Sequence, residues 1–336
     1  MRSNYSCPWR SRAHDSSNAY EEYLARISKI LFLGILLVLC PSCSTKTTTL
    51  EGIQMTIPYR IVLAKSLSSK EKTQLHKQIL AVFHTIDTTY NNWNPDSEIS
   101  KINRAPAHLP LQLSIELSEF LKQVDTLYTL SHGRFDPTLG ALKTLWLLHL
   151  KQHTTPQEEL WKASIKETGW DKLKIDFQTH TLTKTSSLHL DLCGIVKGYA
   201  VDRLLETCQK FCKNAYVEWG GEIKTSGKHP SGRAWQVFSE ATSSIIQLEN
   251  CAIATSGSSC QHWCVEGKVY THILNPYTGK PLEEREHPLQ AVSVVHPNCA
   301  YADALATVLM TFSSKEEALA WAKIQGICAY INDSAS

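Results

Sequence analysis

Two short segments of the chain carry residues suited to holding a phosphate and a metal ion. The first runs from Asp191 to Asp202 and places a carboxylate at the end of a predicted strand, then two glycines and Lys197 in a turn before an amphipathic helix. Free N–H groups at a helix start attract anions, a lysine adds positive charge, and Gly194 lets a ligand approach the backbone closely. Ordinary strand-to-helix turns use the same pattern, so this segment alone leaves both interpretations open.

The second segment is a predicted helix that begins near Ala302. Asp303 and Thr307 are four residues apart, so their side chains share one face of that helix. A carboxylate and a hydroxyl are hard oxygen ligands of the kind that Mg²⁺ prefers, and the ion would keep coordination sites for phosphate oxygens. Alternatively, Asp303 interacts with the helix dipole in the first turn and Thr307 bonds within the helix.

With these two segments, the chain resembles the ApbE family of FAD:protein FMN transferases from about Glu51 to the C-terminus. Each motif of the resemblance is short, but their occurrence in the family's order is hard to obtain by chance. The further motifs are Glu51–Met55, Trp93–Ser100 with Asn103, Phe135–Gly140, Gly220–Ile223, Ala254–Gly257 and His272–Gly279.

The resemblance implies a set of site residues. Positions that contact FAD in the family correspond to Met55, Trp93, Arg134, Phe135, Asp136, Asp191, Lys197, His272 and Ile273. It also implies that Mg²⁺ is bound by the main-chain carbonyl of Gly194 together with Asp303 and Thr307. Asp303 and His272 are the two candidates to orient or deprotonate the attacking hydroxyl, and the sequence does not choose between them. The Gly220-Gly221-Glu222 segment is expected to form a tight turn.

The implied reaction is a phosphoryl transfer. A threonine hydroxyl of an acceptor protein attacks FAD, FMN becomes attached through a phosphoester, and AMP is released. If water attacks instead, the same site is a FAD pyrophosphatase that yields FMN and AMP. A lipoprotein that binds FAD without catalysis is the third alternative. The acceptors implied by the resemblance are subunits of membrane redox pumps.

The N-terminal region carries a predicted export signal. Residues 27–40 form an apolar run of the length of a signal-peptide core, too short to span a bilayer comfortably. Ser42 precedes Cys43, which suits bacterial lipoprotein processing, whereas Cys40 follows the bulky Leu39; an uncleaved anchor is the alternative. We therefore expect an extension and signal peptide over 1–43, a linker over 44–50, and a transferase domain over 51–336. Lipid on Cys43 would hold the protein on the periplasmic face of the inner membrane.

Composition excludes several classes of protein. With 43% apolar residues and a formal charge of +2 over 336 residues, the chain is an ordinary globular protein. Its basic residues are dispersed without an aromatic-basic stripe, so nucleic acid is not expected as a partner. Among eleven cysteines, Cys260 and Cys264 flank His262 in only a weak zinc pattern, and buried thiols are the default interpretation, with disulfides possible after export.

Hydrophobic periodicity and capping residues predict an α+β fold in which short strands and helices alternate. Ser68 and Glu71 form a predicted capping box at the start of one helix, and Gly133 follows a second helix over 115–131. The resemblance implies a mixed core of tandem sheet-helix modules. Further helices are predicted over 199–212, 302–312 and 314–326, and strands over 55–64, 172–175, 188–192, 215–219, 235–238, 251–255, 270–274 and 291–295.

Overall fold

The computed structural model describes residues 47–258, 261–284 and 287–333. Residues Thr45–Ser336 form a compact unit. All three clusters of buried apolar side chains lie inside this unit, so it has the core that it needs to fold without the preceding residues. The predicted signal peptide and Cys43 lie outside the described residues. Within the described part, no helix is long and apolar enough to cross a membrane.

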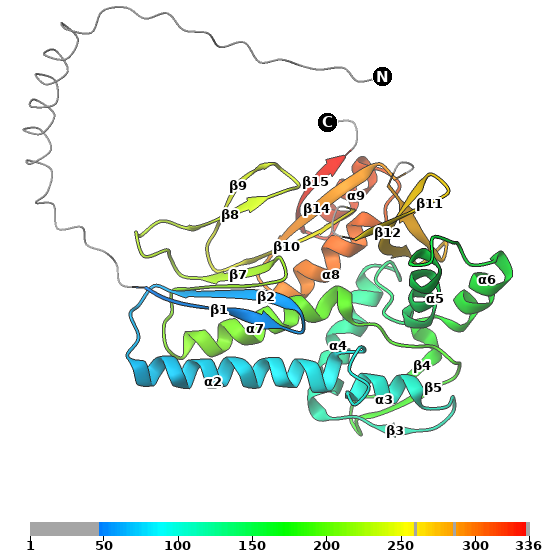
Figure 1. The fold of residues 1–336 in the computed structure, drawn as a ribbon, viewed down its shortest axis with the longest axis horizontal. Coiled ribbons are helices and arrows are strands. Elements are labelled where there is room, and N and C mark those ends of the chain that lie inside the picture. The colour runs from blue at the N-terminus through cyan, green and yellow to red at the C-terminus, as the bar shows by residue number, and fades with distance from the viewer. Residues whose placement is uncertain (1–46, 259–260, 285–286, 334–336) are drawn as a thin grey trace, which may run out of the picture. The chain divides into compact units, whose positions relative to one another are not determined.

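A seven-stranded antiparallel sheet forms the centre of this unit (Figure 1). Each strand pairs with its neighbour in the order β1-β2-β6-β7-β10-β14-β15. The strands are β1 Thr48–Gln54, β2 Ile57–Leu63, β6 Ala215–Trp219, β7 Glu222–Ser226, β10 Ala252–Gly257, β14 Leu289–His296 and β15 Cys328–Asp333.

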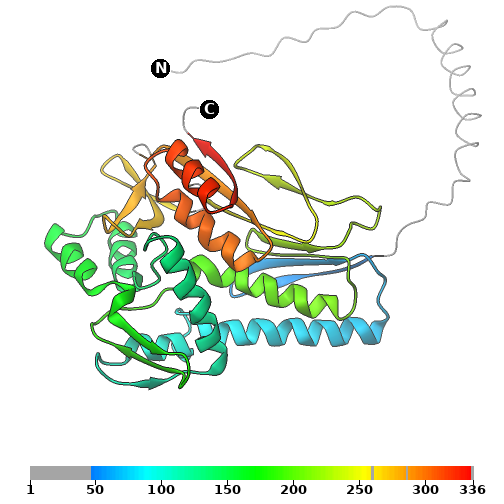
Figure 2. The ribbon, with the colours of Figure 1, turned by 180° about the vertical axis from the view of Figure 1, so that it is seen from behind.

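Helices cover one face of this sheet. Helix α7 (Cys193–Gln209) packs on β6 and β7, α8 (Cys299–Met310) packs on β10 and β14, and the two helices contact each other. Helix α2 (Ser69–Thr85) lies against α7 on the side away from the sheet, as both ribbon views show (Figures 1 and 2). Helix α9 (Lys315–Ile324) packs beside β15.

Smaller elements surround this core. The π-helix η2 (Ile86–Tyr90) continues α2 directly, and a group of helices and short strands lies beyond it (Figure 1). The helices are α3 Glu98–Arg104, α4 Ile115–Leu130, α5 Gly140–Leu150, α6 Glu158–Glu167 and the 3₁₀-helix η3 Trp170–Lys172. The minor sheets consist of β3 Leu111–Gln112, β5 Thr181–Lys184 and β4 Leu173–Asp176; β11 His262–Val265, β12 Lys268–Asn275 and β13 Lys280–Glu283; and β8 Trp235–Ser239 with β9 Ser244–Leu248.

The predicted α+β class is confirmed, and several elements follow directly from local sequence. Ser68 and Glu71 form the predicted capping box of α2, in which each side chain bonds the other residue's backbone N–H. Ser114 caps α4 with its hydroxyl alone, which accepts a hydrogen bond from the Leu117 N–H. The apolar positions of α4 recur every three or four residues and are all buried: Leu117, Phe120, Leu121, Val124 and Leu127.

Three local predictions need correction. Strand β1 begins at Thr48, inside the stretch 44–50 that was expected to be a linker. The stretch 188–192 forms only a single bridge, between His189 and Leu139. Other backbone groups of this stretch bond to Pro137, Gly140 and the side chain of Asn103 instead of to a neighbouring strand. Helix α7 begins at Cys193 rather than Tyr199, so the two glycines and the lysine lie in its first turns and not in a separate turn.

Candidate active site

The start of α7 is fixed by Asp191. Its Oδ1 accepts a hydrogen bond of 2.8 Å from the backbone N–H of Cys193, and its Oδ2 lies 2.8 Å from the ammonium of Lys143 on α5. Burial pushes the pKa of Asp191 upward, but Lys143 and the Cys193 N–H outweigh burial and hold the pKa below its ordinary value. Asp191 is therefore an ionised carboxylate whose two oxygens already have protein partners, and it orients the first turn of α7.

Helices α7 and α8 approach each other closely because Gly198 has no side chain. A Cβ at Gly198 would lie 2.3 Å from the carbonyl oxygen of Cys299, which no packed structure allows. Asp202, one turn further along α7, accepts hydrogen bonds of 3.0 Å from the N–H groups of Cys299 and Ala300. One helix thus caps the other, and the crossing is fixed by backbone contacts.

This crossing brings the three predicted metal-binding residues together. Asp303 is 4% exposed, and its Oδ2 accepts a 3.0 Å hydrogen bond from the N–H of Gly198. A Cβ at Gly194 would lie 3.8 Å from the Thr307 Oγ1, so no other atom separates that backbone from the hydroxyl. Ser256 on β10 supports Thr307 through a 3.0 Å bond between the two hydroxyls. A carboxylate, a hydroxyl and a helix-terminal backbone therefore converge within one turn of each helix.

Lys197 is held between two carboxylates at this crossing. Its ammonium pairs with Glu222 Oε1, and both Glu222 and Asp303 outweigh burial and keep the pKa of Lys197 above its ordinary value. Glu222 is 2% exposed, and its Oε2 has no hydrogen-bond partner in the described part of the chain. Burial, reinforced by Asp303, raises the pKa of Glu222 to about 8. The pKa of Asp303 is raised by burial as well, so two buried carboxylates face a single ammonium at this crossing.

Sequence reasoning missed the role of Glu222. The expected tight turn is present, with φ of 65° at Gly220 and 98° at Gly221. The turn aims the next side chain inward, because Glu222 is the first residue of β7 and its neighbour Trp219 ends β6. A glutamate directly after two glycines at a strand start was the available signal, but only the helix crossing reveals its partner, Lys197.

His272 lies on β12, within electrostatic range of Lys143 and Lys197. Its Nδ1 is 3.4 Å from the carbonyl oxygen of Gln261. Burial lowers the pKa of His272, and the positive charges of Lys143 and Lys197 lower it further. The imidazole is therefore neutral near pH 7 and can accept a proton. Ile273, its neighbour, is 5% exposed and belongs to the main core, so its side chain packs inward.

The predicted flavin-contacting residues are spread over several elements. Met55 occupies the two-residue turn between β1 and β2, where Met55 and Thr56 have φ of 49° and 66°, the pattern of a type I′ hairpin. Phe135 is buried next to Gly194. Asp136 Oδ1 accepts bonds from both the N–H and the hydroxyl of Thr138, and burial raises the pKa of Asp136.

The side chain of Arg134 links separate segments of the described structure. Its guanidinium lies 3.8 Å from the ring centroid of Phe312 and 4.9 Å from that of Tyr277. It also donates a 3.0 Å hydrogen bond to the carbonyl oxygen of Thr311. These contacts join the segment before Phe135 to the end of α8, so Arg134 holds the walls of the site together.

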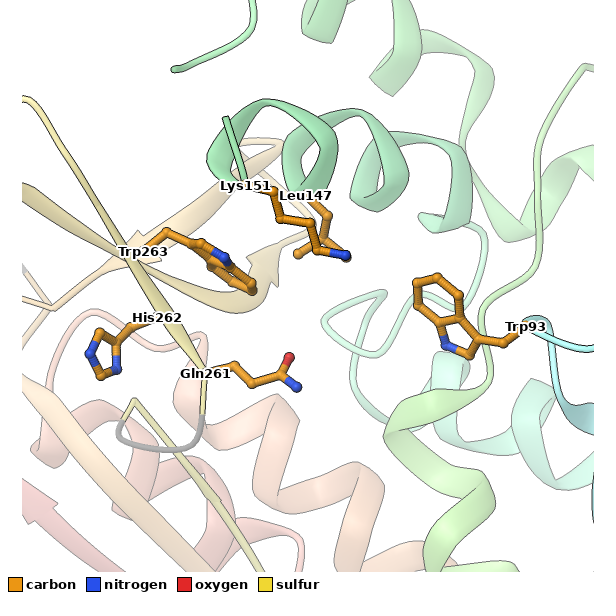
Figure 3. Close-up of a pocket in the computed structure, with 6 residues that line it drawn as sticks. All are labelled: Trp93, Leu147, Lys151, Gln261, His262 and Trp263. Atoms are coloured by element: carbon orange, nitrogen blue, oxygen red, sulfur yellow. The ribbon is translucent and has the colours of Figure 1, made fainter. Parts of the chain in front are cut away.

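Trp93 is 69% exposed and lines two adjoining pockets. The larger, of about 390 Å³, is lined by Trp93, Leu147, Lys151, Gln261, His262 and Trp263. Figure 3 shows the two indoles on opposite sides of this pocket, with the ammonium of Lys151 between them. The smaller, of about 270 Å³, reaches Gly140 and His189. Two indoles and a cation suit a flat ring that carries phosphate.

The loop that carries Trp93 is well supported despite the exposed ring. The carboxylate of Asp87, in η2, accepts hydrogen bonds of 2.7 Å from Asn91 and 2.9 Å from Asn94. The side chain of Asn91 in turn accepts from the Trp93 N–H at 3.0 Å. The backbone is thus fixed while the indole remains free to meet a ligand.

The weak zinc pattern finds no support among the described residues. No group of three His, Cys, Asp or Glu residues within them is arranged to hold a metal ion, and Cys260 lies outside them. Cys208 and Cys299 are buried free thiols, as the default interpretation expects.

Comparisons with known proteins find similar sequences and a similar fold. The model of the ApbE family matches residues 55–331. A FAD:protein FMN transferase of Chlamydia pneumoniae is 62% identical over 314 residues, which cover 93% of this chain and all of that protein. A FAD:protein FMN transferase of Chlamydia muridarum is 56% identical over 90% of this chain and 96% of its own length. The structure is similar to the apo form of the Pseudomonas stutzeri flavinyl transferase ApbE, at 29% identity, with a TM-score of 0.77 and 85% of this chain and 90% of that one covered.

Proposed function

We propose, from the premise that this chain belongs to the ApbE family and is a FAD:protein FMN transferase, that it works with Mg²⁺ and places FMN on a threonine hydroxyl of its acceptor. The observation that carries this proposal is the α7–α8 crossing, where Gly194, Asp303 and Thr307 meet. A carboxylate, a hydroxyl and a backbone carbonyl are the hard oxygen donors that Mg²⁺ selects. The two carboxyl groups of Asp303 and Glu222 also have only the ammonium of Lys197 between them, so an added cation is favoured there.

Different residues around the crossing would bind different parts of FAD. A bound Mg²⁺ would supply positive charge that polarises the pyrophosphate and stabilises the departing AMP. The ammonium of Lys197 would bind the same phosphates as a point charge. Before FAD binds, Glu222 pairs with this ammonium and holds it at the crossing. The indole of Trp93 offers a face to a flat ring, and Phe135 closes the pocket wall beside Gly194.

The chemical step is an in-line displacement. The acceptor hydroxyl attacks the phosphorus on the FMN side of the pyrophosphate, the bond to the AMP phosphate breaks, and AMP leaves. Of the two candidates left open by the sequence, we favour His272 as the base that takes the hydroxyl proton. Burial, and then the charges of Lys143 and Lys197, lower the pKa of His272 and favour the neutral imidazole, whereas Asp303 already accepts a hydrogen bond from Gly198.

The test is incubation with FAD, Mg²⁺ and a candidate acceptor, followed by a denaturing gel examined for flavin fluorescence. We expect fluorescence that stays with the acceptor, and mass spectrometry should find FMN on a threonine. Free FMN and AMP with an unmodified acceptor would instead identify a FAD pyrophosphatase. Retention of intact FAD without turnover would identify a flavin-binding protein.

We also propose that the protein is exported and anchored by lipid on Cys43, at the periplasmic face of the inner membrane. The supporting pattern is the apolar run at 27–40 followed by a small residue and Cys43. Tethering would keep the enzyme near acceptors that are subunits of membrane redox pumps. Mass spectrometry of the mature N-terminus tests the anchor, and a Cys43→Ser variant should leave the membrane fraction.

A further inference from the structure

Four loops meet at the end of the molecule where β1 begins. The Thr48 Oγ1 accepts a 2.9 Å hydrogen bond from the N–H of Leu67, which ties the first strand to the loop before α2. The main-chain carbonyl oxygen of Asn214 accepts a 2.9 Å hydrogen bond from the Ala64 N–H. The side-chain Oδ1 of Asn214 accepts a 3.1 Å hydrogen bond from the Lys228 N–H. Asn250 completes the group by accepting from Gly227 at 2.8 Å. Figures 1 and 2 place these loops at one extremity of the Thr45–Ser336 unit.

This extremity is strongly basic. We define the basic end as residues 64–71, 210–214, 227–233 and 249–250. It holds six basic residues against two acidic ones, a formal charge of +4, while the whole chain has +2, so the rest of the chain is net negative. The basic residues are Lys65, Lys70, Lys210, Lys213, Lys228 and Arg233, all exposed.

Four of these six cations, Lys70, Lys210, Lys213 and Arg233, have no carboxylate partner in the described part of the chain. Glu71 pairs with Lys65, and Glu249 lies 4.0 Å from Lys228. Exposed, unpaired lysines on one end of a protein raise the local potential and attract an anionic surface.

The few residues between Cys43 and β1 limit how far the basic end can lie from a lipid on Cys43. Five residue steps separate Cys43 from Thr48, and an extended chain spans at most about 3.5 Å per residue, so the reach is about 17 Å. A lipid on Cys43 would therefore hold the basic end close to the bilayer. We propose that the basic end docks on anionic phospholipid headgroups; the inference rests on the proposed anchor at Cys43.

Docking in this orientation would set the height of the active site. Helix α7 starts at the helix crossing with Gly194 and its last residue, Gln209, directly precedes the basic end. Its 17 residues measure about 25 Å at 1.5 Å per residue. The site would thus stand off the lipid surface by roughly that length, facing the extramembrane part of an acceptor and not the lipid.

Vesicle binding of the unlipidated unit, residues 45–336, tests the charge contribution separately from the anchor. The probes are vesicles of phosphatidylcholine alone and of phosphatidylcholine mixed with phosphatidylglycerol. We expect binding only to the mixed vesicles, and weaker binding as salt is added. The triple variant Lys70→Gln, Lys210→Gln, Lys213→Gln should bind them about a hundredfold more weakly, at roughly fivefold per charge removed.

The matched control is Lys101→Gln, Lys174→Gln, Lys323→Gln, which removes three exposed lysines on α3, β4 and α9. It should bind as the parent does, and both triple variants should melt and transfer FMN to a soluble acceptor as the parent does. Equal losses in the two triple variants, or no binding to mixed vesicles, would overturn the docking proposal. Binding to an oligonucleotide in place of vesicles would overturn it too. Absence of lipid on Cys43 in the mature protein is measured separately and would remove the anchor alone.

Discussion

The helix crossing and the pocket lined by Trp93 and Trp263 differ in how firmly their side chains are held and in the chemistry that they offer. At the crossing, Gly198, Asp202 and Asp303 join α7 to α8 through backbone contacts that leave no freedom. At the pocket, Trp93 extends from a loop and Trp263 from strand β11, and the Trp93 ring is mostly exposed. Phosphate chemistry requires fixed charges, because a displaced charge no longer matches the transition state. A flat ring needs only a surface, so its pocket tolerates mobile side chains.

This contrast predicts that changes at the crossing alter the rate, whereas changes at the pocket alter the affinity for FAD. Asp303→Ala should have the largest effect. Loss of the carboxylate removes the anionic ligand expected for Mg²⁺, and Mg²⁺-dependent FMN transfer should fall by at least about a thousandfold. Transfer is measured as protein-bound flavin fluorescence against Mg²⁺ concentration. Melting should show a folded protein, because the Gly198 N–H loses its bond to Asp303 but Lys197 keeps its ion pair with Glu222.

Thr307→Ser is the control for this substitution because it keeps a hydroxyl at the same position. It should retain most of the activity. Unchanged transfer in Asp303→Ala, with normal Mg²⁺ dependence, would remove the metal from the crossing and with it the difference drawn between the two regions.

The second prediction concerns pH. His272 has a pKa held below 6.5 by burial, Lys143 and Lys197, so the neutral imidazole is the form present above that lowered pKa. The transfer rate should be flat near neutrality and fall about tenfold per unit once the pH drops through the pKa of His272, because protonated imidazole cannot accept a proton. In His272→Gln the rate should be low and the acid limb absent. An acid limb that persists in His272→Gln would assign the base to another group.

The third prediction compares two glycines of α7. Gly198→Ala places a methyl group 2.3 Å from the Cys299 carbonyl, so the helices must separate, and the free energy of unfolding should fall by about 1–3 kcal/mol. Gly194→Ala meets only Phe135 at 3.7 Å and Thr307 at 3.8 Å, so stability should change little. Transfer should nevertheless slow in Gly194→Ala, because the methyl group narrows the space beside the Thr307 hydroxyl. Urea unfolding and FMN transfer of both variants separate the two effects; equal stabilities would contradict the close crossing.

Local sequence predicted what depends on local interactions. The capping box of α2, the buried face of α4 and strand β6 (Ala215–Trp219) were all predicted from short-range patterns and were confirmed. The resemblance of the motifs to the ApbE family predicted Gly194, Asp303 and Thr307 as members of one site, and the structure places them at the same helix crossing. Their role as ligands remains a prediction.

What sequence could not supply depends on partners far along the chain. Gly198 was expected in a turn, but α8, about one hundred residues away, makes it a helical contact. Lys143 lies on α5, whose apolar residues show no single clear face, so neither the helix nor its ion pair with Asp191 was predicted. Glu222 looked like the end of a turn because its partner Lys197 is visible only after α7 packs on β7.

The smallest predicted effect lies at the pocket. Trp93→Ala should raise the KM for FAD by about tenfold and leave kcat nearly unchanged, because stacking of a flat ring on one exposed indole contributes on the order of 1 kcal/mol. Trp263→Ala, on the opposite wall, should act in the same direction, and Ile324→Ala, which removes an exposed apolar side chain from α9, serves as the control. If Trp93→Ala lowers kcat as strongly as a change at the crossing, the pocket must position the reacting phosphorus as well. The two regions would then form one rigid site, because a surface that only holds a ring affects binding in the ground state and the transition state equally.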